Sequence, residues 1–148
     1  AAFLLLRHLR GRWADSQKRY FLTRIVLSAA ALAGFLAVAL GAFGAHGLKE
    51  RLAPDMMAVF QTAVQYHFYH ALALLLVASV MLSKPATSGL GLSAACFVTG
   101  LLLFSGSLYL LAVTGVRWLG AITPLGGLAF LIGWLALAWA AFKLPGSA

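Results

Sequence analysis

The sequence predicts an all-α membrane protein, a four-transmembrane-helix up-down bundle, and two observations carry this prediction. The first is composition: 63% of the 148 residues are hydrophobic and only 9% are charged, whereas a soluble domain is roughly half apolar and about a quarter charged. A soluble fold of this size could not bury so much apolar surface. The second is that charged residues divide the chain into four long uncharged stretches. These observations favour a single membrane domain over a soluble enzyme.

The uncharged stretches set the expected membrane spans. A spanning helix needs about 20 apolar residues, and each stretch has room for one crossing but not comfortably for two. Glycines, prolines and caps refine the ends, and we expect approximate spans of 24–45, 56–83, 89–114 and 119–142 in a membrane domain of residues 24–148. The last helix could begin at Trp118 or at Thr123. The second start is favoured, because Thr123 would be an N-cap followed by Pro124 at the first helical position. Short connections imply antiparallel neighbours.

The Lys and Arg counts predict the orientation. With four crossings, the N-terminal segment, the turn at Lys84 and the C-terminus share one side, while Lys49, Arg51 and Arg117 lie on the other side. The first side carries most of the eleven positive charges, and such charge is retained in the cytoplasm. We therefore expect both termini to be cytoplasmic.

The basic N-terminal segment, residues 1–23, is expected to differ from the rest. Wound as a helix, it gathers its apolar side chains on one face: Leu5, Leu6, Leu9, Trp13 and Tyr20. This pattern predicts an N-terminal interfacial amphipathic helix on the cytoplasmic membrane surface. A targeting segment is the alternative, because the segment is rich in Arg and poor in acids. Nucleic acid is not an expected partner, since no recognition module follows the basic cluster; membrane lipids are.

Small residues predict where the helices pack, because in lipid they let backbones approach closely. Two sets of five stand out: Ala29, Ala33, Ala37, Gly41 and Ala45 at a spacing of four, and Gly126, Ala129, Gly133, Ala136 and Ala140 at steps of three and four. A shorter set is Gly91, Ala95 and Thr99. We expect these faces in the bundle core, with oligomer contacts as the alternative.

Polar residues of separate segments converge on one layer. Counting about 20 residues outward from the cytoplasmic ends places the following in the outer third of the bundle: His46, Gln65, Tyr66, His67, Tyr69, His70, Ser105, Ser107, Tyr109 and Thr123. His67 and His70 are three residues apart, so both can serve one site. Because ionisable groups are costly in hydrocarbon, their presence at this depth suggests function.

Three interpretations of this hypothetical binding cluster stay open. It is a buried network that pins the helices, a metal or haem site, or a site for a small ligand, a lipid headgroup or a quinone. The network is favoured, and neither a metal nor a cofactor is expected, because no acidic side chain within the membrane could orient a ligating imidazole. Catalysis is not expected either. Glu50 and Asp55 fall in the outer loop and Asp15 on the opposite side, which leaves no Ser-His-acid set.

Four ordered motifs resemble one known family. They are 41–48 (GAFGAHGL), 65–75 (QYHFYHALALL), 104–109 (FSGSLY) and 122–127 (ITPLGG). Over roughly 24–142 the chain is similar to the small membrane-protein family of unknown function numbered 423, which includes bacterial inner-membrane proteins and the eukaryotic transmembrane protein 256. The resemblance implies a multi-pass protein of the bacterial plasma (inner) membrane and brings no reaction. Residues 1–23 extend beyond the usual family start.

Two functions are therefore expected of the chain. The first is non-enzymatic: a small subunit or stabilising partner of a larger membrane complex, or a homo-oligomer, as its size and small-residue faces suggest. The alternative is a ligand-binding membrane protein for a lipid, quinone, haem or metal, which would use the outer His/Tyr cluster.

Overall fold

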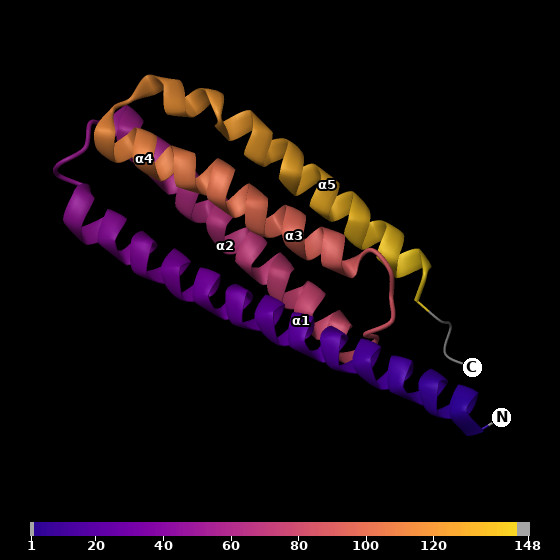
Figure 1. The fold of residues 1–148 in the computed structure, drawn as a ribbon. Helices are drawn as coiled ribbons and strands as arrows, with labels where there is room; N and C mark the ends of the chain where they lie inside the picture. Colours follow the sequence, from indigo (N-terminus) through magenta and orange to yellow (C-terminus); the bar gives the residue numbers. More distant parts are fainter. Residues whose placement is uncertain (1, 145–148) are drawn as a thin grey trace.

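The computed structural model describes residues 2–144, with side chains at 11 and from 13 to 144, and this part is helical apart from short turns (Figure 1). The α-helices are α1 (Ala2–Phe43), α2 (Pro54–Ser83), α3 (Leu90–Gly100), α4 (Gly106–Thr114) and α5 (Thr123–Phe142). Two π-helical turns, η1 (Gly44–Leu48) and η2 (Leu101–Ser105), and a 3-10 turn, η3 (Arg117–Ala121), complete the order. The prediction of an all-α chain is confirmed for the described residues.

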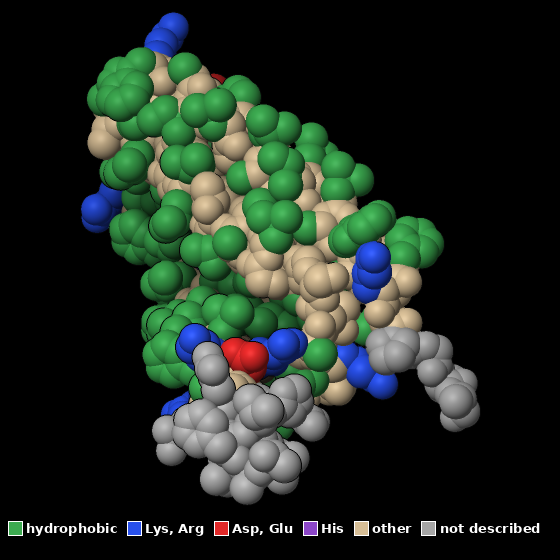
Figure 2. All heavy atoms as spheres, turned by 45° about the vertical axis from the view of Figure 1, so that its right-hand side comes forward, with side chains coloured by type: hydrophobic (Ala, Val, Ile, Leu, Met, Phe, Trp, Pro, Cys, Tyr) green, Lys and Arg blue, Asp and Glu red, His purple; other side chains and the backbone are tan. Residues whose placement is uncertain are grey.

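Four helices in this part of the chain are long and apolar enough to cross a membrane: Trp13–Leu48, Pro54–Ser83, Leu90–Thr114 and Arg117–Phe142. The third combines α3, η2 and α4 without a break in the chain direction (Figure 1). The α5 helix begins at Thr123 with Pro124 in its first turn, close to the start favoured from the sequence. The predicted N-cap is wrong, because Ile122 occupies the N-cap position without a side-chain cap and the Thr123 hydroxyl lies against Ser107 instead. Hydrophobic side chains cover most of the side wall seen in Figure 2, as a lipid-facing surface requires.

The α1 helix continues without interruption through the point where a separate N-terminal helix was expected. It has 42 residues, which at 1.5 Å per residue is about 63 Å, roughly twice the thickness of a hydrocarbon core. A helix lying flat on the membrane would need a bend before Arg24, and α1 has none there (Figure 1). The side chains of Leu5, Leu6 and Leu9 lie outside those the structure describes, so the amphipathic face stays a prediction.

Short connections place the helices side by side. The α1 helix packs mainly on α2, α3 packs on α5, and α2 also contacts α3 and α4. The described ends of the chain lie at the same end of the molecule as the turn between α2 and α3, and the other two connections lie at the opposite end (Figure 1). Gly89 and Gly115 supply the positive φ, 96° and 70°, that the turns before α3 and after α4 require.

The contact face of α1 differs from the predicted stripe. Its buried residues step by three and four from Thr23 through Val26, Ala30 and Ala33 to Ala37. The next buried residue is Gly44, seven residues further on in η1, followed by Leu48. A strict spacing of four drifts by about 40° per step around a helix of 3.6 residues per turn. The drift explains why Ala33 and Ala37 are buried while Ala45, at the end of the predicted stripe, is exposed.

The small residues predicted on α5, which are spaced alternately by three and four residues, stay on one face of the helix over its whole length. Gly126, Gly133, Ala136 and Ala140 are buried and Ala129 is half-buried. On α3 the expectation is wrong, because Gly91, Ala95 and Thr99 are exposed. Instead, the buried face of α3 is formed by Leu90, Ser93, Ala94, Phe97 and Gly100, with Phe97 fully buried against Gly133 of α5. These contacts form the main core, where Leu74, Val77 and Phe130 also lie.

Candidate functional site

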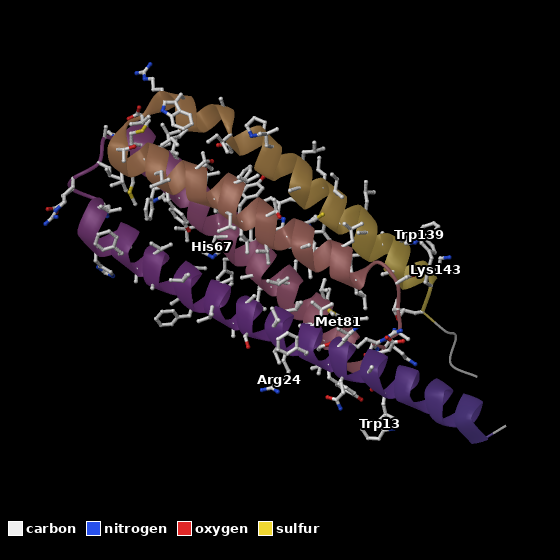
Figure 3. The ribbon with its side chains drawn as sticks, in the orientation of Figure 1. Trp13, Arg24, His67, Met81, Trp139 and Lys143 are labelled. Carbon is white, nitrogen blue, oxygen red and sulfur yellow. The ribbon has the colours of Figure 1, made fainter. Side chains whose placement is uncertain are left out.

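His67 and Tyr109 form a polar pair inside the bundle. His67, in the middle of α2, is buried, and its Nδ1 lies 3.2 Å from the Tyr109 hydroxyl oxygen on α4. The Tyr109 ring also packs on Phe60, with ring centroids 5.0 Å apart. His67 points from α2 toward α1, as Figure 3 shows, and lies beside Ala33 of that helix. The pair therefore links three helices around one hydrogen bond.

His70 faces a different neighbour, α5. Its Nδ1 lies 2.8 Å from the Tyr66 carbonyl oxygen, which can only accept, so Nδ1 carries the proton. Its Nε2 then accepts a hydrogen bond of 3.3 Å from the Trp134 indole N–H. The imidazole stacks on Phe130 with 3.4 Å between ring centroids and 8° between planes. Both ring nitrogens are thus occupied by protein groups, which is typical of a structural histidine.

A third contact joins α4 to α5. The hydroxyls of Ser107 and Thr123 lie 2.8 Å apart, and Ser107 also donates to the Phe104 carbonyl oxygen at 3.0 Å. Next to them, Gly126 sits directly against the backbone of η2. A π-helical turn and a glycine allow this close approach, since no side chain separates the two backbones. The sequences FSGSLY and ITPLGG therefore belong to one helix contact.

Of the remaining predicted residues, Tyr66 joins the His70 contact, because its carbonyl oxygen accepts from His70 and its ring stacks on the imidazole with 6.1 Å between centroids. The others do not join these groups. Gln65 donates to the Tyr69 hydroxyl at 2.8 Å, but both side chains are exposed on α2. Tyr66 is 39% exposed, while Ser105 is buried with an unpartnered hydroxyl. His46 is exposed on η1 near the end of the molecule. The predicted single cluster is thus divided among separate contacts, with His67 and His70 serving different ones.

An apolar groove runs beside the His67–Tyr109 pair. We call it the lateral groove; its volume is about 290 Å³, and its walls include Ala33, Leu36, His67, Leu101, Gly106 and Tyr109. Residues of α1 form one wall of the groove and residues of the α3–η2–α4 segment form the other. His67 and Leu74 of α2 also line it. Leu32 and Leu102 at its margin are 63% and 70% exposed, so the groove opens on the lipid-facing side. Only His67 and Tyr109 bring polar side chains to it.

Sequence reasoning missed the aromatic partners of His70. Phe130 and Trp134 are four residues apart on α5, and Phe97 approaches from α3. Phe104 of η2 packs in turn on Phe130. The spacing of Phe130 and Trp134 was the available signal, since residues four apart share a helix face. Aromatic residues in an apolar run equally suit a lipid-facing surface, and the sequence does not distinguish the two. Within the described residues, His, Cys, Asp and Glu form no group of three that could hold a metal ion.

Comparison with known proteins gives a consistent family. The family model described as "Protein of unknown function (DUF423)" matches residues 40–127, a range that contains all four motifs. The chain is 44% identical to the UPF0382 membrane protein YwdK of Bacillus subtilis, over 81% of this chain and 98% of the relative. It is 39% identical to the UPF0382 inner membrane protein YgdD of Escherichia coli, over 82% and 92% respectively.

A third relative, from Haemophilus influenzae, is also named a UPF0382 membrane protein and is 44% identical over 79% of this chain and 93% of its own length. No solved structure matches the chain. The family-model match spans α2, α3, η2, α4 and the start of α5, and it includes His67, His70, Tyr109 and Gly126. The chain therefore belongs to the DUF423 family of membrane proteins, as the motifs predicted.

Proposed function

We propose that this membrane protein binds an elongated apolar molecule with one hydrogen-bonding head, a quinone or a lipid of that form, in the lateral groove. The observation that carries the proposal is the groove itself, an apolar space of about 290 Å³ with one polar pair in its wall. Binding sites for small molecules are mostly apolar and have few, well-placed polar groups. The proposal makes the protein a binder and not an enzyme.

The head group would lie at the His67–Tyr109 pair. The Tyr109 hydroxyl can donate one hydrogen bond and accept others, and the His67 imidazole can do either through its two nitrogens. A carbonyl or hydroxyl on the ligand would satisfy these groups in a medium without water. The rest of the molecule would lie along the leucines of α1 and η2, and it would enter from the bilayer past Leu32 and Leu102.

Filling the groove tests this proposal. We expect Gly106→Leu to weaken binding of decylubiquinone at least tenfold, because the leucine would occupy the groove; a Cβ at Gly106 meets no atom closer than 3.8 Å, so the backbone accepts it. Tyr109→Phe should weaken binding by about tenfold through loss of one hydroxyl. Native mass spectrometry of the solubilised protein with added decylubiquinone measures both.

Gly34→Leu is the matched control, since a Cβ at Gly34 on α1 meets nothing within 4 Å and Gly34 lies outside the groove. It should leave binding unchanged. Equal binding by Gly106→Leu and Gly34→Leu, or no adduct with the unaltered protein, would contradict a binding role for the groove.

A second candidate is the role of small subunit or stabilising partner. It is favoured by the exposed small residues of α3, Gly91, Ala95 and Thr99, which leave a face where a helix of another protein or another copy could approach closely. The same mass spectra report on it. Extra mass from a protein partner would support this role, and a monomer under the mildest solubilisation would argue against it.

We also propose that the helices form an up-down bundle with both termini in the cytoplasm, in the bacterial inner membrane. The excess of Lys and Arg on the side of the chain ends supports this orientation. Alkaline phosphatase, which is active only outside the cytoplasm, should be inactive when fused after Lys143 and active when inserted after Glu50. Activity of the fusion after Lys143 would place the C-terminus outside the cytoplasm and contradict the proposed orientation.

A further inference from the structure

A basic pocket lies at the end of the bundle where α2 and α5 end. We call it the lysine pocket; its volume is about 390 Å³ and its lining residues are Ser83, Lys84, Pro85, Ala86, Thr87 and Lys143. Lys84 follows α2 directly and Lys143 follows α5 directly, so two helices far apart in sequence each bring one ammonium group. Ser83 and Thr87 bring the other polar side chains of its lining; the Ser83 hydroxyl donates to the Val80 carbonyl oxygen of its own helix at 3.1 Å, so Thr87 supplies the hydroxyl for an anion.

The surroundings of the lysine pocket are positive as well. Arg19 of α1 donates from Nη1 to the Pro85 carbonyl oxygen at 3.3 Å, which brings a third cation to the same turn. Of the three acidic residues in the chain, Glu50 and Asp55 lie at the opposite end of the molecule, and the third, Asp15, is on α1 outside the pocket. An anion would therefore meet cations from three helices.

Apolar and aromatic surface adjoins the pocket. Lys143 Nζ lies 4.8 Å from the centroid of the Trp139 ring, and Figure 3 shows these two side chains together at the end of α5. Trp139 is 59% exposed and Phe142 is 86% exposed. Tryptophan beside lysine at a helix end is typical of the membrane–water boundary. A charged group in the pocket would thus have hydrocarbon-facing side chains next to it.

We propose that the lysine pocket binds the phosphate of an anionic phospholipid whose acyl chains lie along Trp139 and Phe142. Phosphate is the group that lysines and hydroxyls at a bilayer boundary recognise, and basic pockets between membrane helices hold anionic headgroups in this way. The site is separate from the lateral groove and does not depend on it. It would fasten the ends of α2 and α5 to one lipid molecule.

Removing both charges tests this inference. The full chain is purified from mixed micelles of phosphatidylglycerol and phosphatidylcholine, and the retained lipid is counted by mass spectrometry. Each lysine near an anionic headgroup is expected to contribute about fivefold, so Lys84→Gln with Lys143→Gln should reduce the preference for phosphatidylglycerol by roughly 25-fold. The matched control is Lys49→Gln with Arg51→Gln, the same charge change at the other end, which should retain the preference.

Three outcomes are informative. Loss in the pocket variant alone supports the site. Equal loss in the control would overturn it, since general charge attraction would then explain the preference, and so would full retention by the pocket variant. A last arm adds millimolar inorganic phosphate: a phospholipid site keeps its lipid, whereas displacement of the lipid by phosphate alone assigns the pocket to the free anion and overturns the lipid assignment.

Discussion

Replacing Gly126 with alanine is expected to destabilise the protein by about 3 kcal/mol, the largest effect of a single methyl group in this fold. A Cβ at Gly126 would come within 2.8 Å of the Leu103 carbonyl carbon and the Phe104 Cα, and it would meet the Phe104 amide nitrogen as well. All three atoms belong to the η2 backbone, which cannot rotate away as a side chain can. The α4–α5 contact would have to separate, and the bond between Ser107 and Thr123 with it.

Thermal unfolding in detergent, followed by the fraction that remains monodisperse, measures this effect. Gly127→Ala is the matched control, because its Cβ would meet only the Phe104 ring, at 3.8 Å, an ordinary contact. Alanine in place of glycine inside a helix normally stabilises by roughly 0.5–1 kcal/mol, so the neighbouring variant should unfold at the same temperature or higher. A similar loss in both variants would contradict the backbone contact as the cause.

His70→Leu is expected to destabilise the protein by about 2 kcal/mol and to leave any ligand binding in the lateral groove intact. Leucine keeps the bulk of the side chain, but it removes the acceptor for the Trp134 N–H and the flat face that stacks on Phe130. An indole N–H left without a partner among apolar side chains costs roughly 1–3 kcal/mol. Unfolding of the variant in detergent measures the loss.

The Trp134→Phe variant identifies the cause, since phenylalanine has no N–H to leave unpaired. In that background His70→Leu should cost markedly less, which a double-mutant cycle detects. The exposed His46 provides the second comparison, and His46→Leu should change stability by less than about 0.5 kcal/mol. A large loss for His46→Leu, or the same loss for His70→Leu with and without Trp134, would contradict the network at α5.

The contacts of His67 and His70 assign different roles to two histidines that were expected to serve one site. His70 has both nitrogens bound by protein groups and Phe130 across its face. His67 lies in the wall of the lateral groove, where its Nδ1 faces the Tyr109 hydroxyl and its ring lies against the Ala33 backbone of α1. The network interpretation therefore suits His70, while His67 is the histidine of the proposed binding function.

The number of helices, their approximate bounds and the membrane class follow from the sequence by itself. Charged residues interrupt apolar stretches that are each long enough for one span, and Pro124 lies in the first turn of the last helix, a position that proline favours. These features are local, because a charge cannot remain in hydrocarbon and a helix needs a fixed length to cross it. The family was also recognisable from the sequence, because each of its motifs is a short contiguous segment.

The tertiary structure alone decided which polar residues meet. Side chains three residues apart on a helix point in directions that differ by about 60°. Because α2 has helices on several sides, this angle is enough for His67 to face α1 and α4 while His70 faces α5. The sequence gives the depth of each side chain but not the rotation of its helix, and rotation depends on close contacts between helices. Gly126 against the η2 backbone and Gly41 of α1 against Val64 of α2 are such contacts. They fixed the division of the polar layer, the lateral groove beside His67 and the lysine pocket at the helix ends.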